Sequence, residues 1–408
     1  MKWREFEPES DAPAAHRVWR EVGWIREGEE KRVDMLFSGS DVLVADLNGQ
    51  PECLVARGRG TVRHLRTDLP FICIETVTTS HIARKRGLAG RLTAASIAAG
   101  VADGGAVAGL GIFEQGYYNR LGFGNGSYDI QVSLDPADLM VDAEFGVPER
   151  LGLDDWEAIH ASRLGCPRGH GACTLSAPEF TAAHMALGGG TFGLGYRDFD
   201  GNITHHVWFE GRGENGPYSV RWMAYRDHDQ LIELLSLIKA LGDQVRLVHI
   251  TEPPGIQLAD LISHPRRSEL VSRGSEFEVK SRAIAWWQMR ICDMEAALAA
   301  THLPAERHLR FALQMTDPIE RYLPEDSPWR GVGGDWIITV GPESLAERGT
   351  DASLPRLTAS VNAFTRMWLG VRPATGLSVT DELSGDPDLL RQLDEVLLLP
   401  TPMPNWGF

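Results

Sequence analysis

One strand–turn–helix run limits the fold of this chain more than any other part of its sequence. It begins with the strongly apolar stretch LPFICIETVTT (69–79), passes through the turn SHIARKRG (80–87) and continues as the alanine-rich stretch LAGRLTAASIAAGVADGG (88–105). The first stretch has the apolar, β-branched composition of a buried strand, and the last has the length of a helix. Together with a hairpin expected at Asn48-Gly49, this run predicts a mixed α/β layer architecture.

The length of 408 residues suggests two or three domains. We expect a first unit over residues 1–149, with a loop or domain joint at 136–148. Residues 150–295 repeat the coarse order of the first elements without the basic turn, which is the pattern of a duplicated unit that kept its fold and lost a ligand site. Residues 296–408 indicate a small α+β layer that ends in the extended, proline-rich tail PTPMPNWGF.

The charge balance excludes some classes of partner. The chain has 40 Lys and Arg against 56 Asp and Glu, a net charge of −16. This argues against nucleic-acid binding, which needs a basic face, and it favours cationic small molecules or basic peptides. The N-terminal stretch has no apolar signal-peptide core, and no run of about eighteen apolar residues is present. We therefore expect no membrane span and a cytoplasmic protein.

The five cysteines are too few and too scattered for a disulfide scaffold in a chain of this length. Cys166, His170 and Cys173 superficially resemble a zinc knuckle in the segment GCPRGHGAC. Structural zinc takes four ligands, and no second ligand pair completes the set. We expect no metal there, and interpret the segment as a glycine-rich loop with idle thiols.

The densest basic cluster of this acidic chain lies at the start of an expected helix. Residues 84–89, RKRGLA, fit the pattern R-x-x-G-x-A between a strand and a helix. A helix start offers unpaired N–H groups and a positive dipole end, which together bind phosphate or pyrophosphate. A purely stabilising role is disfavoured, because basic side chains oppose the dipole at this end. The fingerprints of P-loop and dinucleotide-binding proteins are both absent.

Two segments carry a family resemblance. VTTSHIARKRGLAGRL (77–92) and GLGIFEQGYYNRLGFGNGSYDI (109–130) resemble the pyrophosphate loop and the following cofactor-binding segment of GNAT-type N-acetyltransferases. More narrowly, the chain is similar to the enhanced intracellular survival family of multi-acetylating aminoglycoside acetyltransferases. YYNRLGFG and the terminal Phe408 are the most specific matches.

That resemblance implies tandem GNAT folds followed by a sterol-carrier-protein-like α+β domain, with acetyl-CoA as co-substrate and a homohexamer as the assembly. The boundaries expected on this basis are 1–149 for the acetyltransferase domain, 150–295 for a second GNAT-like domain without the CoA loop, and 296–408 for the sterol-carrier-like domain.

The same resemblance implies a binding site for CoA. The strand before the basic turn would pair with pantetheine through its backbone, one of its N–H groups would polarise the thioester oxygen, and the amides after the turn would bind the pyrophosphate. For Phe113, a buried position in a strand is an equally good interpretation. The cofactor-binding residues implied are Val77, Thr78, Thr79, Lys85, Arg86, Gly87, Leu88, Ala89, Gly90, Phe113 and Glu114.

The catalytic residues implied are Tyr118 and Phe408. Tyr118 matches the family tyrosine that protonates the departing thiolate, and a phenol is a suitable acid for a leaving group of similar basicity. Tyr117 beside it is the structural alternative. The terminal carboxylate of Phe408 matches the family base, and it acts either by accepting a proton or by orienting the amine. Glu75, on the central strand, is the alternative base.

The acceptor is the least constrained part of the prediction. Trp24 and Asp293 are the expected substrate-binding residues, and Gly407 replaces a carboxylate that would help to bind amines. The leading hypothesis is acetylation of primary amines on aminoglycosides or similar polyamines. The alternatives are acetylation of protein lysines and a non-catalytic carrier of a lipid or another small molecule.

Overall fold

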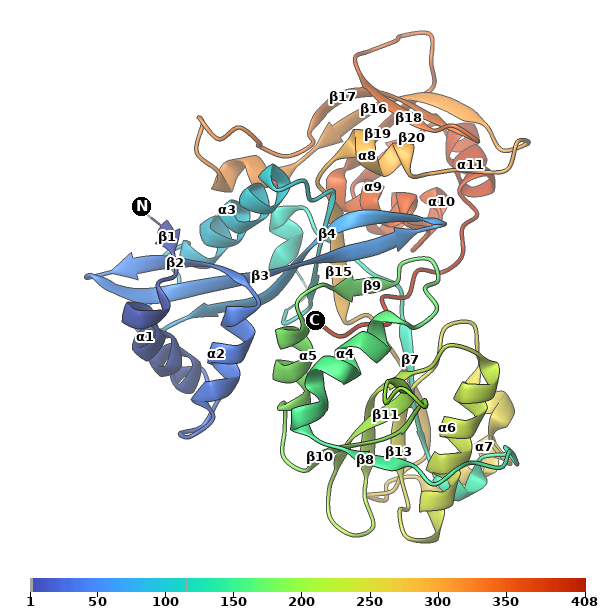
Figure 1. Cartoon of the computed structure of the whole chain (residues 1–408). Helices are drawn as coiled ribbons and strands as arrows, with labels where there is room; N and C mark the ends of the chain where they lie inside the picture. Colours follow the sequence, from blue (N-terminus) through green and yellow to red (C-terminus); the bar gives the residue numbers. More distant parts are fainter. Residues whose placement is uncertain (1–2, 115) are drawn as a thin grey trace. The chain divides into compact units, whose positions relative to one another are not determined.

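The computed structural model describes residues 3–114 and 116–408 (Figure 1). The chain divides into two compact units, and neither is continuous in sequence. The first unit contains the residues up to Ser127, Gly169–Ala177 and Ala285–Phe408, and the second contains Tyr128–Arg168 and Pro178–Ile284. Within these ranges the predicted mixed α/β architecture is confirmed, with three separate sheets.

The first unit is built on an eight-stranded sheet in the order β1-β2-β3-β4-β5-β15-β6, with β9 paired to β3 outside this path. The pair β4–β5 is parallel, and the other pairs are antiparallel. The predicted hairpin at Asn48-Gly49 joins β2 to β3, and both residues have positive φ, as a two-residue turn of this kind requires. The strands are β1 Trp3–Glu5, β2 Asp41–Leu47, β3 Gln50–His64, β4 Thr67–Thr79, β5 Val107–Gly111, β6 Gly124–Asn125, β9 Cys173–Leu175 and β15 Trp287–Ile291.

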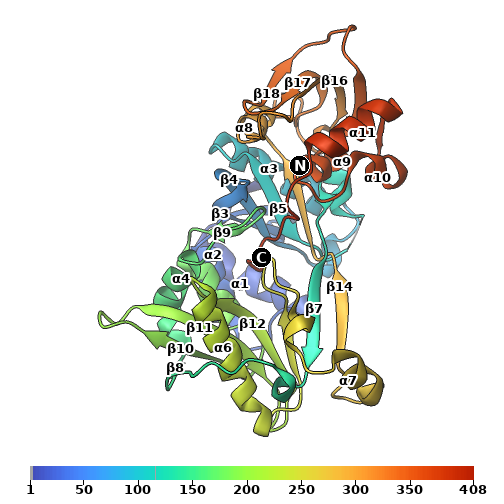
Figure 2. The same ribbon diagram turned by 90° about the vertical axis from the view of Figure 1, so that its right-hand side faces the viewer.

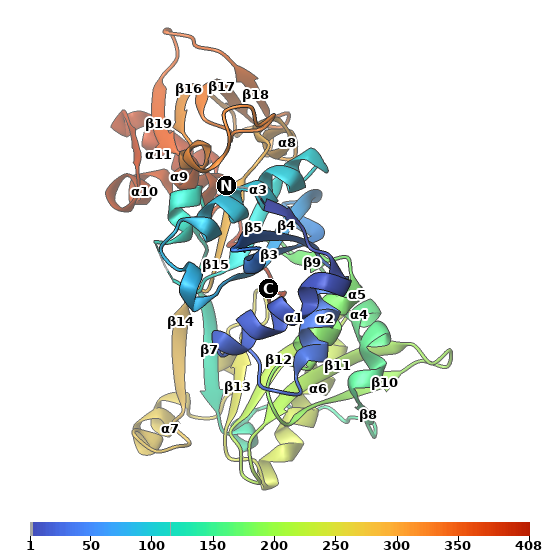
Figure 3. The same ribbon diagram turned by 90° about the vertical axis from the view of Figure 1, so that its left-hand side faces the viewer.

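Helices cover both faces of this sheet. Helix α3 (Leu88–Ala102) lies on one face, while α1 (Pro8–Glu21) and α2 (Glu30–Ser38) lie on the other (Figures 1 and 3). The apolar core under α3 includes Leu92 and Ile97 of the helix. The alanines of α3 lower the cost of forming the helix and let it pack closely on the strands.

A second, five-stranded sheet belongs to the same compact unit, in the order β18-β17-β16-β19-β20. Its bounds are β16 Leu309–Thr316, β17 Gly334–Val340, β18 Leu345–Arg348, β19 Arg356–Ser360 and β20 Leu383–Gly385. Four helices accompany it: α8 Met294–Ala299, α9 Val361–Trp368, α10 Ala374–Thr380 and α11 Pro387–Val396. This sheet and its four helices are called the C-terminal layer below. Helix α9 also packs against β15 and β6, so the C-terminal layer lies against the first sheet.

The second unit has a seven-stranded sheet in the order β14-β7-β13-β12-β11-β10-β8. Figure 2 shows β7 and β14 side by side at one edge. The strands are β7 Asp129–Leu134, β8 Glu149–Leu151, β10 Thr191–Arg197, β11 Ile203–Gly211, β12 Tyr218–Ala224, β13 Val248–Thr251 and β14 Lys280–Ile284. The helices are α4 Trp156–Leu164, α5 Pro178–Met185, α6 His228–Ala240 and α7 Pro265–Ser272.

The unit boundaries differ from those expected at 149/150 and 295/296. Strand β7 pairs in the second unit's sheet, although its sequence position suggested the first unit. Strand β15 pairs with β5 and β6 in the first sheet, although its position suggested the second unit. The residue pattern predicts that a segment is a strand but not which strand it pairs with, and this is the reason for the difference.

Across the residues that the structure describes, every helix is too short or too polar to cross a membrane.

Candidate active site

The site begins where β4 and β5 diverge. The two strands pair from Phe71 opposite Val107 to Ile74 opposite Leu110, and β4 then continues to Thr79 without a described strand on that side. The β3–β4 register also shifts here, since Ile74 and Thr76 have partners in β3 while Glu75 between them has none. Such a bulge bends a strand and increases its twist. The divergence therefore leaves the backbone edge of residues 75–79 open to an extended ligand.

The turn between β4 and α3 has the geometry of an anion site. Gly87 is the N-cap residue of α3 with φ of +73°, a left-handed conformation that glycine adopts without strain. No described side chain caps this helix, so its first N–H groups still lack a side-chain acceptor. Arg84, Lys85 and Arg86 are all exposed beside it. This end of α3 therefore combines amides without a side-chain acceptor, the positive dipole end and exposed positive charge.

The corresponding helix of the second unit is different. Its helix α6 starts after Asp227, whose side chain accepts a hydrogen bond of 2.9 Å from the N–H of Gln230. A carboxylate at this position already occupies the amides that an anion would need. The second unit thus repeats the strand–helix order but not the anion site.

Anchoring from α1 holds the basic turn in place. Glu21 accepts a hydrogen bond from the backbone N–H of His81, and its carboxylate lies 3.2 Å from Nδ1 of the same histidine. The short helix His81–Ala83 is therefore fixed at its start.

Trp24, a predicted substrate-binding residue, lies on the loop after α1. It is 38% exposed and packs edge-on against Trp19 with ring centroids 5.1 Å apart.

Two tyrosines, Tyr117 and Tyr118, follow β5 in the chain. Tyr118 is only 8% exposed, and its ring packs edge-on against Tyr117 (centroids 4.9 Å apart) and Phe123. Burial, together with Tyr117 and Cys53, raises the pKa of Tyr118 above its ordinary value, so the phenol keeps its proton well above neutral pH. Burial also raises the pKa of Tyr117 to about 12, and its hydroxyl faces the start of α3 at Gly90.

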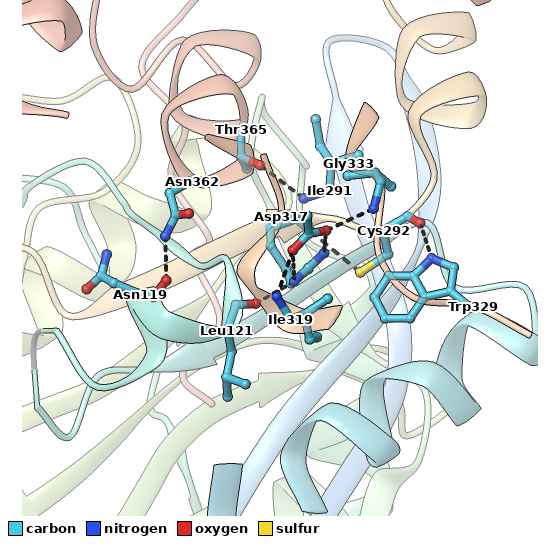
Figure 4. A network of polar contacts seen from close by, with 12 residues as sticks. Asn119, Leu121, Ile291, Cys292, Asp317, Ile319, Trp329, Gly333, Asn362 and Thr365 are labelled. Carbon is cyan, nitrogen blue, oxygen red and sulfur yellow. Dashed lines mark hydrogen bonds and ion pairs between the residues drawn. The ribbon is translucent and has the colours of Figure 1, made fainter. Parts of the chain in front are cut away.

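Asparagine side chains fix the short helix Tyr118–Leu121, called the tyrosine turn below. The Oδ1 of Asn119 accepts from the N–H of Gly116 at 2.8 Å, and its Nδ2 donates to the carbonyl of Phe123 at 2.9 Å. From α9, Asn362 donates to the carbonyls of both Asn119 and Phe123 at 2.8 Å (Figure 4). The C-terminal layer therefore holds the tyrosine turn by direct hydrogen bonds.

A buried ion pair supports the same turn from β15. The side chains of Arg290 and Asp317 are both inaccessible to solvent, and Nη2 of Arg290 lies 2.6 Å from Oδ2 of Asp317. Arg290 also donates to the carbonyl of Leu121, the last residue of the tyrosine turn. Asp317 accepts from the N–H groups of Ile319 and Val332 at 3.2 and 2.9 Å. One charged pair thus links the tyrosine turn to the C-terminal layer.

Replacing Asp317 by asparagine should lower the free energy of unfolding by about 3–5 kcal/mol, because Arg290 would keep a buried charge without its counter-charge. Chemical denaturation of both proteins measures this difference. Glu347→Gln is the matched control, since its pair with Arg310 is half-exposed and 4.0 Å long, and we expect a change of about 0.5 kcal/mol or less. Equal effects of the two substitutions would contradict this role of the buried pair.

The C-terminal tail ends at the strand divergence. The ring of Phe408 lies against Phe71 and Trp286, with centroids 5.7 and 5.3 Å apart. A Cβ atom placed on Gly111 would stand 2.4 Å from the carbonyl oxygen of Phe408, so the terminal group lies directly against the last residue of β5. Trp406 is buried. Phe408 is therefore packed, and its main-chain carbonyl group lies at the point where β4 and β5 diverge.

The other site residues predicted from the sequence lie either on β4 or directly after β5. Glu75 is the bulge residue of β4, and the thiol of Cys73 donates to it at 3.7 Å. Val77, Thr78 and Thr79 lie on the open part of β4. Phe113 is 86% exposed after β5, so the interpretation as a buried strand residue is wrong, and Glu114 beside it is also exposed.

Asp293 is not brought together with these residues. Its side chain caps α8 by accepting from the N–H of Ala296 at 3.0 Å. It follows the end of β15 that pairs with Val107, whereas Phe408 lies at Gly111, at the opposite end of β5. Sequence reasoning missed Phe71, Gly111 and Trp286, which surround the terminal residue and carry no motif of their own.

Comparisons with known proteins support the fold. No protein-family model and no curated protein matches the sequence. Solved structures do match the whole chain. A probable N-acyltransferase from Enterococcus faecalis V583 has a TM-score of 0.77 at 18% identity, covering 100% of this chain and 99% of its own. The fold is that of GCN5-related N-acetyltransferases. A member from Anabaena variabilis has a TM-score of 0.77 at 13% identity, and Eis1 from Mycobacterium abscessus has 0.75 at 15%, with full coverage of both chains in each case.

Proposed function

We propose that this protein is an acetyl-CoA-dependent N-acetyltransferase that acetylates primary amines of aminoglycosides or similar polyamines. The observation that carries the proposal is the packing of the Phe408 terminus against Gly111, where β4 and β5 diverge beside an uncapped helix start. Phe408, the open edge of β4 and the start of α3 all belong to one compact unit, which supports the proposal.

The described residues fit CoA in two ways. The open edge of Val77, Thr78 and Thr79 presents backbone groups suited to the amides of pantetheine. The N–H groups of Leu88, Ala89 and Gly90, with Lys85 and Arg86, suit the pyrophosphate. Phe113 and Glu114 lie exposed beyond β5 and would contact the bound molecule from that side.

In the proposed reaction, acetyl-CoA supplies the acetyl group as a thioester. A backbone N–H of the open β4 edge polarises the carbonyl oxygen. Tyr118 donates its phenolic proton to the departing sulfur. The carboxylate of Phe408 attracts the ammonium group of the acceptor and receives or relays its proton, and Glu75 of the β4 bulge is the alternative base.

Two features support a cationic acceptor. The ring of Phe408 packs against the rings of Phe71 and Trp286 next to the proposed carboxylate, and a cationic sugar or polyamine binds well to such aromatic surfaces. The net charge of −16 also attracts polycations to the protein. Trp24, half-exposed on the loop after α1, is the proposed pocket wall, whereas Asp293 serves as a helix cap.

An acceptor panel tests the substrate class. Release of free CoA thiol would be followed with aminoglycosides, linear polyamines and a lysine-containing peptide at equal amine concentration. We expect aminoglycosides or polyamines to give the highest kcat/KM. Preference for the peptide would favour the protein-lysine alternative, and the absence of thiol release with every amine would favour the carrier alternative.

Neutralising the basic turn should weaken CoA binding. The double substitution Lys85→Gln and Arg86→Gln removes two charged donors, and we expect the Kd for CoA to rise about tenfold or more. Isothermal titration calorimetry measures this. Arg266→Gln with Arg267→Gln is the matched control, because these residues are also exposed at a helix start, in the second unit. Unchanged CoA binding by the Lys85/Arg86 variant would contradict the assignment of the turn.

A further inference from the structure

The segment Gly169–Ala177, called the clamp below, leaves its sequence neighbours and belongs to the first unit. Its strand β9 pairs antiparallel with β3, with Leu175 opposite Gly60 and Cys173 opposite Val62. The hydroxyls of Thr174 and Thr61 lie 2.8 Å apart across this pair. The chain on either side of the clamp belongs to the other unit. The contacts of the clamp within the first unit therefore indicate what it does there.

The clamp is hydrogen-bonded to the C-terminal tail. The N–H of Met403 donates to the carbonyl of His170 at 3.0 Å, and the N–H of Cys173 donates to the carbonyl of Pro404 at 2.8 Å. Gly171 between them has φ of +82°, and a Cβ atom there would lie 2.6 Å from Cβ of Pro402. The tail therefore runs along the clamp as an extended segment, in van der Waals contact at a glycine.

His170 fixes the clamp to the rest of the unit. Its Nδ1 accepts from the backbone N–H of Leu65 at 3.0 Å, and its Nε2 donates to the carbonyl of Leu369 at 2.9 Å. Because the Leu65 group is a donor, the ring must be neutral with its proton on Nε2. Burial lowers the pKa of His170, which keeps the ring neutral. Only 7% of the residue is exposed.

One imidazole thus joins three segments that are distant in sequence. They are the β3–β4 turn at Leu65, the end of α9 at Leu369, and the clamp that holds Met403 and Pro404. From Pro404 the tail reaches Phe408 in four residues, with Trp406 buried on the way. The segment between the clamp and the terminal carboxylate is short and packed. A shift of the clamp would therefore also move the carboxylate.

We propose that His170 is a positioning residue, which through the clamp sets the place of the Phe408 carboxylate at the end of β5. The proposal rests on the proposed function, because it assigns the carboxylate a part in acetyl transfer. It gives the clamp a role in the reaction, although no residue of the clamp belongs to the basic turn or to the tyrosine turn.

The test compares His170→Ala with His170→Asn, whose Oδ1 stands near the Nδ1 position and can still accept from Leu65. Hydrogen exchange at residues 402–408 reports the order of the tail without any activity measurement. We expect His170→Ala to speed this exchange and to lower kcat about tenfold or more, since small misplacements of a reacting group have effects of this size. The Kd for CoA should stay unchanged, and His170→Asn should restore part of both losses.

Two further variants keep the result interpretable. His308 is an exposed histidine of the same unit, and His308→Ala is the matched control. It should change neither the hydrogen exchange of the tail nor kcat. Gly111→Ala places a methyl group against the Phe408 carboxylate without touching the clamp. It should lower kcat while tail exchange at Met403 stays slow, and it tests the role of the carboxylate even if the His170 variants fold poorly.

The outcomes separate the two proposals. Slow tail exchange in His170→Ala, or fast exchange with unchanged kcat, would overturn the positioning role. Absence of turnover in the unmodified protein with every amine would overturn the proposed function and, with it, the catalytic part of the positioning role. The exchange data would still show whether His170 orders the tail.

Discussion

Replacing Tyr118 by phenylalanine should lower kcat about a hundredfold or more, because general acid catalysis by a positioned side chain contributes rate factors of this size. The Kd for acetyl-CoA should hardly change, since the ring keeps its packing against Tyr117 and Phe123. Steady-state kinetics measure kcat, and calorimetry measures Kd in the same preparations. A loss confined to kcat would show that the phenolic proton acts in the reaction and not in binding.

Tyr117→Phe is the matched control for this substitution. Its hydroxyl faces the start of α3 at Gly90, and we expect a change in the Kd for CoA rather than in kcat. If Tyr117→Phe had the larger effect on kcat, the two assignments would have to be exchanged. If neither substitution lowered kcat, the acid would be another group.

The pH dependence of kcat follows from the same burial. An acid catalyst is active while protonated, so its activity is lost as pH rises through its pKa. Because burial raises the pKa of Tyr118, this loss moves to higher pH, and kcat should show no alkaline decline from Tyr118 below about pH 10, the ordinary pKa of a phenol.

Extending the chain by two glycines beyond Phe408 should lower kcat about a hundredfold, because the extension removes a charge at the reacting site and displaces groups that must be aligned. The terminal carboxylate becomes a neutral peptide group, and the added residues collide with Gly111 and the neighbouring rings. CoA binding should persist, because the basic turn and the open β4 edge are untouched. Turnover and CoA affinity of the intact and extended chains are compared side by side.

The control for this extension inserts the same two glycines at the exposed Asp200-Gly201 turn of the second unit, where they meet no neighbour. Equal turnover of the intact and C-terminally extended chains would rule out the Phe408 carboxylate as a participant. In that event Glu75→Gln becomes the informative substitution, and a large loss of kcat would assign the base to the β4 bulge.

Much of the first unit could be predicted from its sequence because the signals are local. The apolar strand at 69–79 lies within β4 (Thr67–Thr79), and the alanine-rich helix became α3. The hairpin turn at Asn48-Gly49 was likewise readable from residue type. Each of these elements is specified by neighbouring residues, through side-chain period and backbone preference.

The parts that were not predictable depend on pairing between distant segments. Nothing in the residues of β7 or β15 indicates which sheet receives them. The clamp is an example at smaller scale, since GCPRGHGAC suggested only a glycine-rich loop, whereas His170 joins three distant segments. Asp293 was expected to bind substrate, but an acidic residue before a helix equally predicts a cap, and it is a cap that the structure shows.

Acetyl transfer is tested by quantifying both products of one reaction mixture that contains the intact protein, acetyl-CoA and one aminoglycoside. Free CoA is measured as thiol, and the acetylated amine is identified by mass spectrometry and NMR. We expect the two products to form in equal amounts, the acetyl group to be on a primary amine, and neither product to form without the protein. Folded protein that binds CoA but acetylates no aminoglycoside or polyamine would contradict the proposed function.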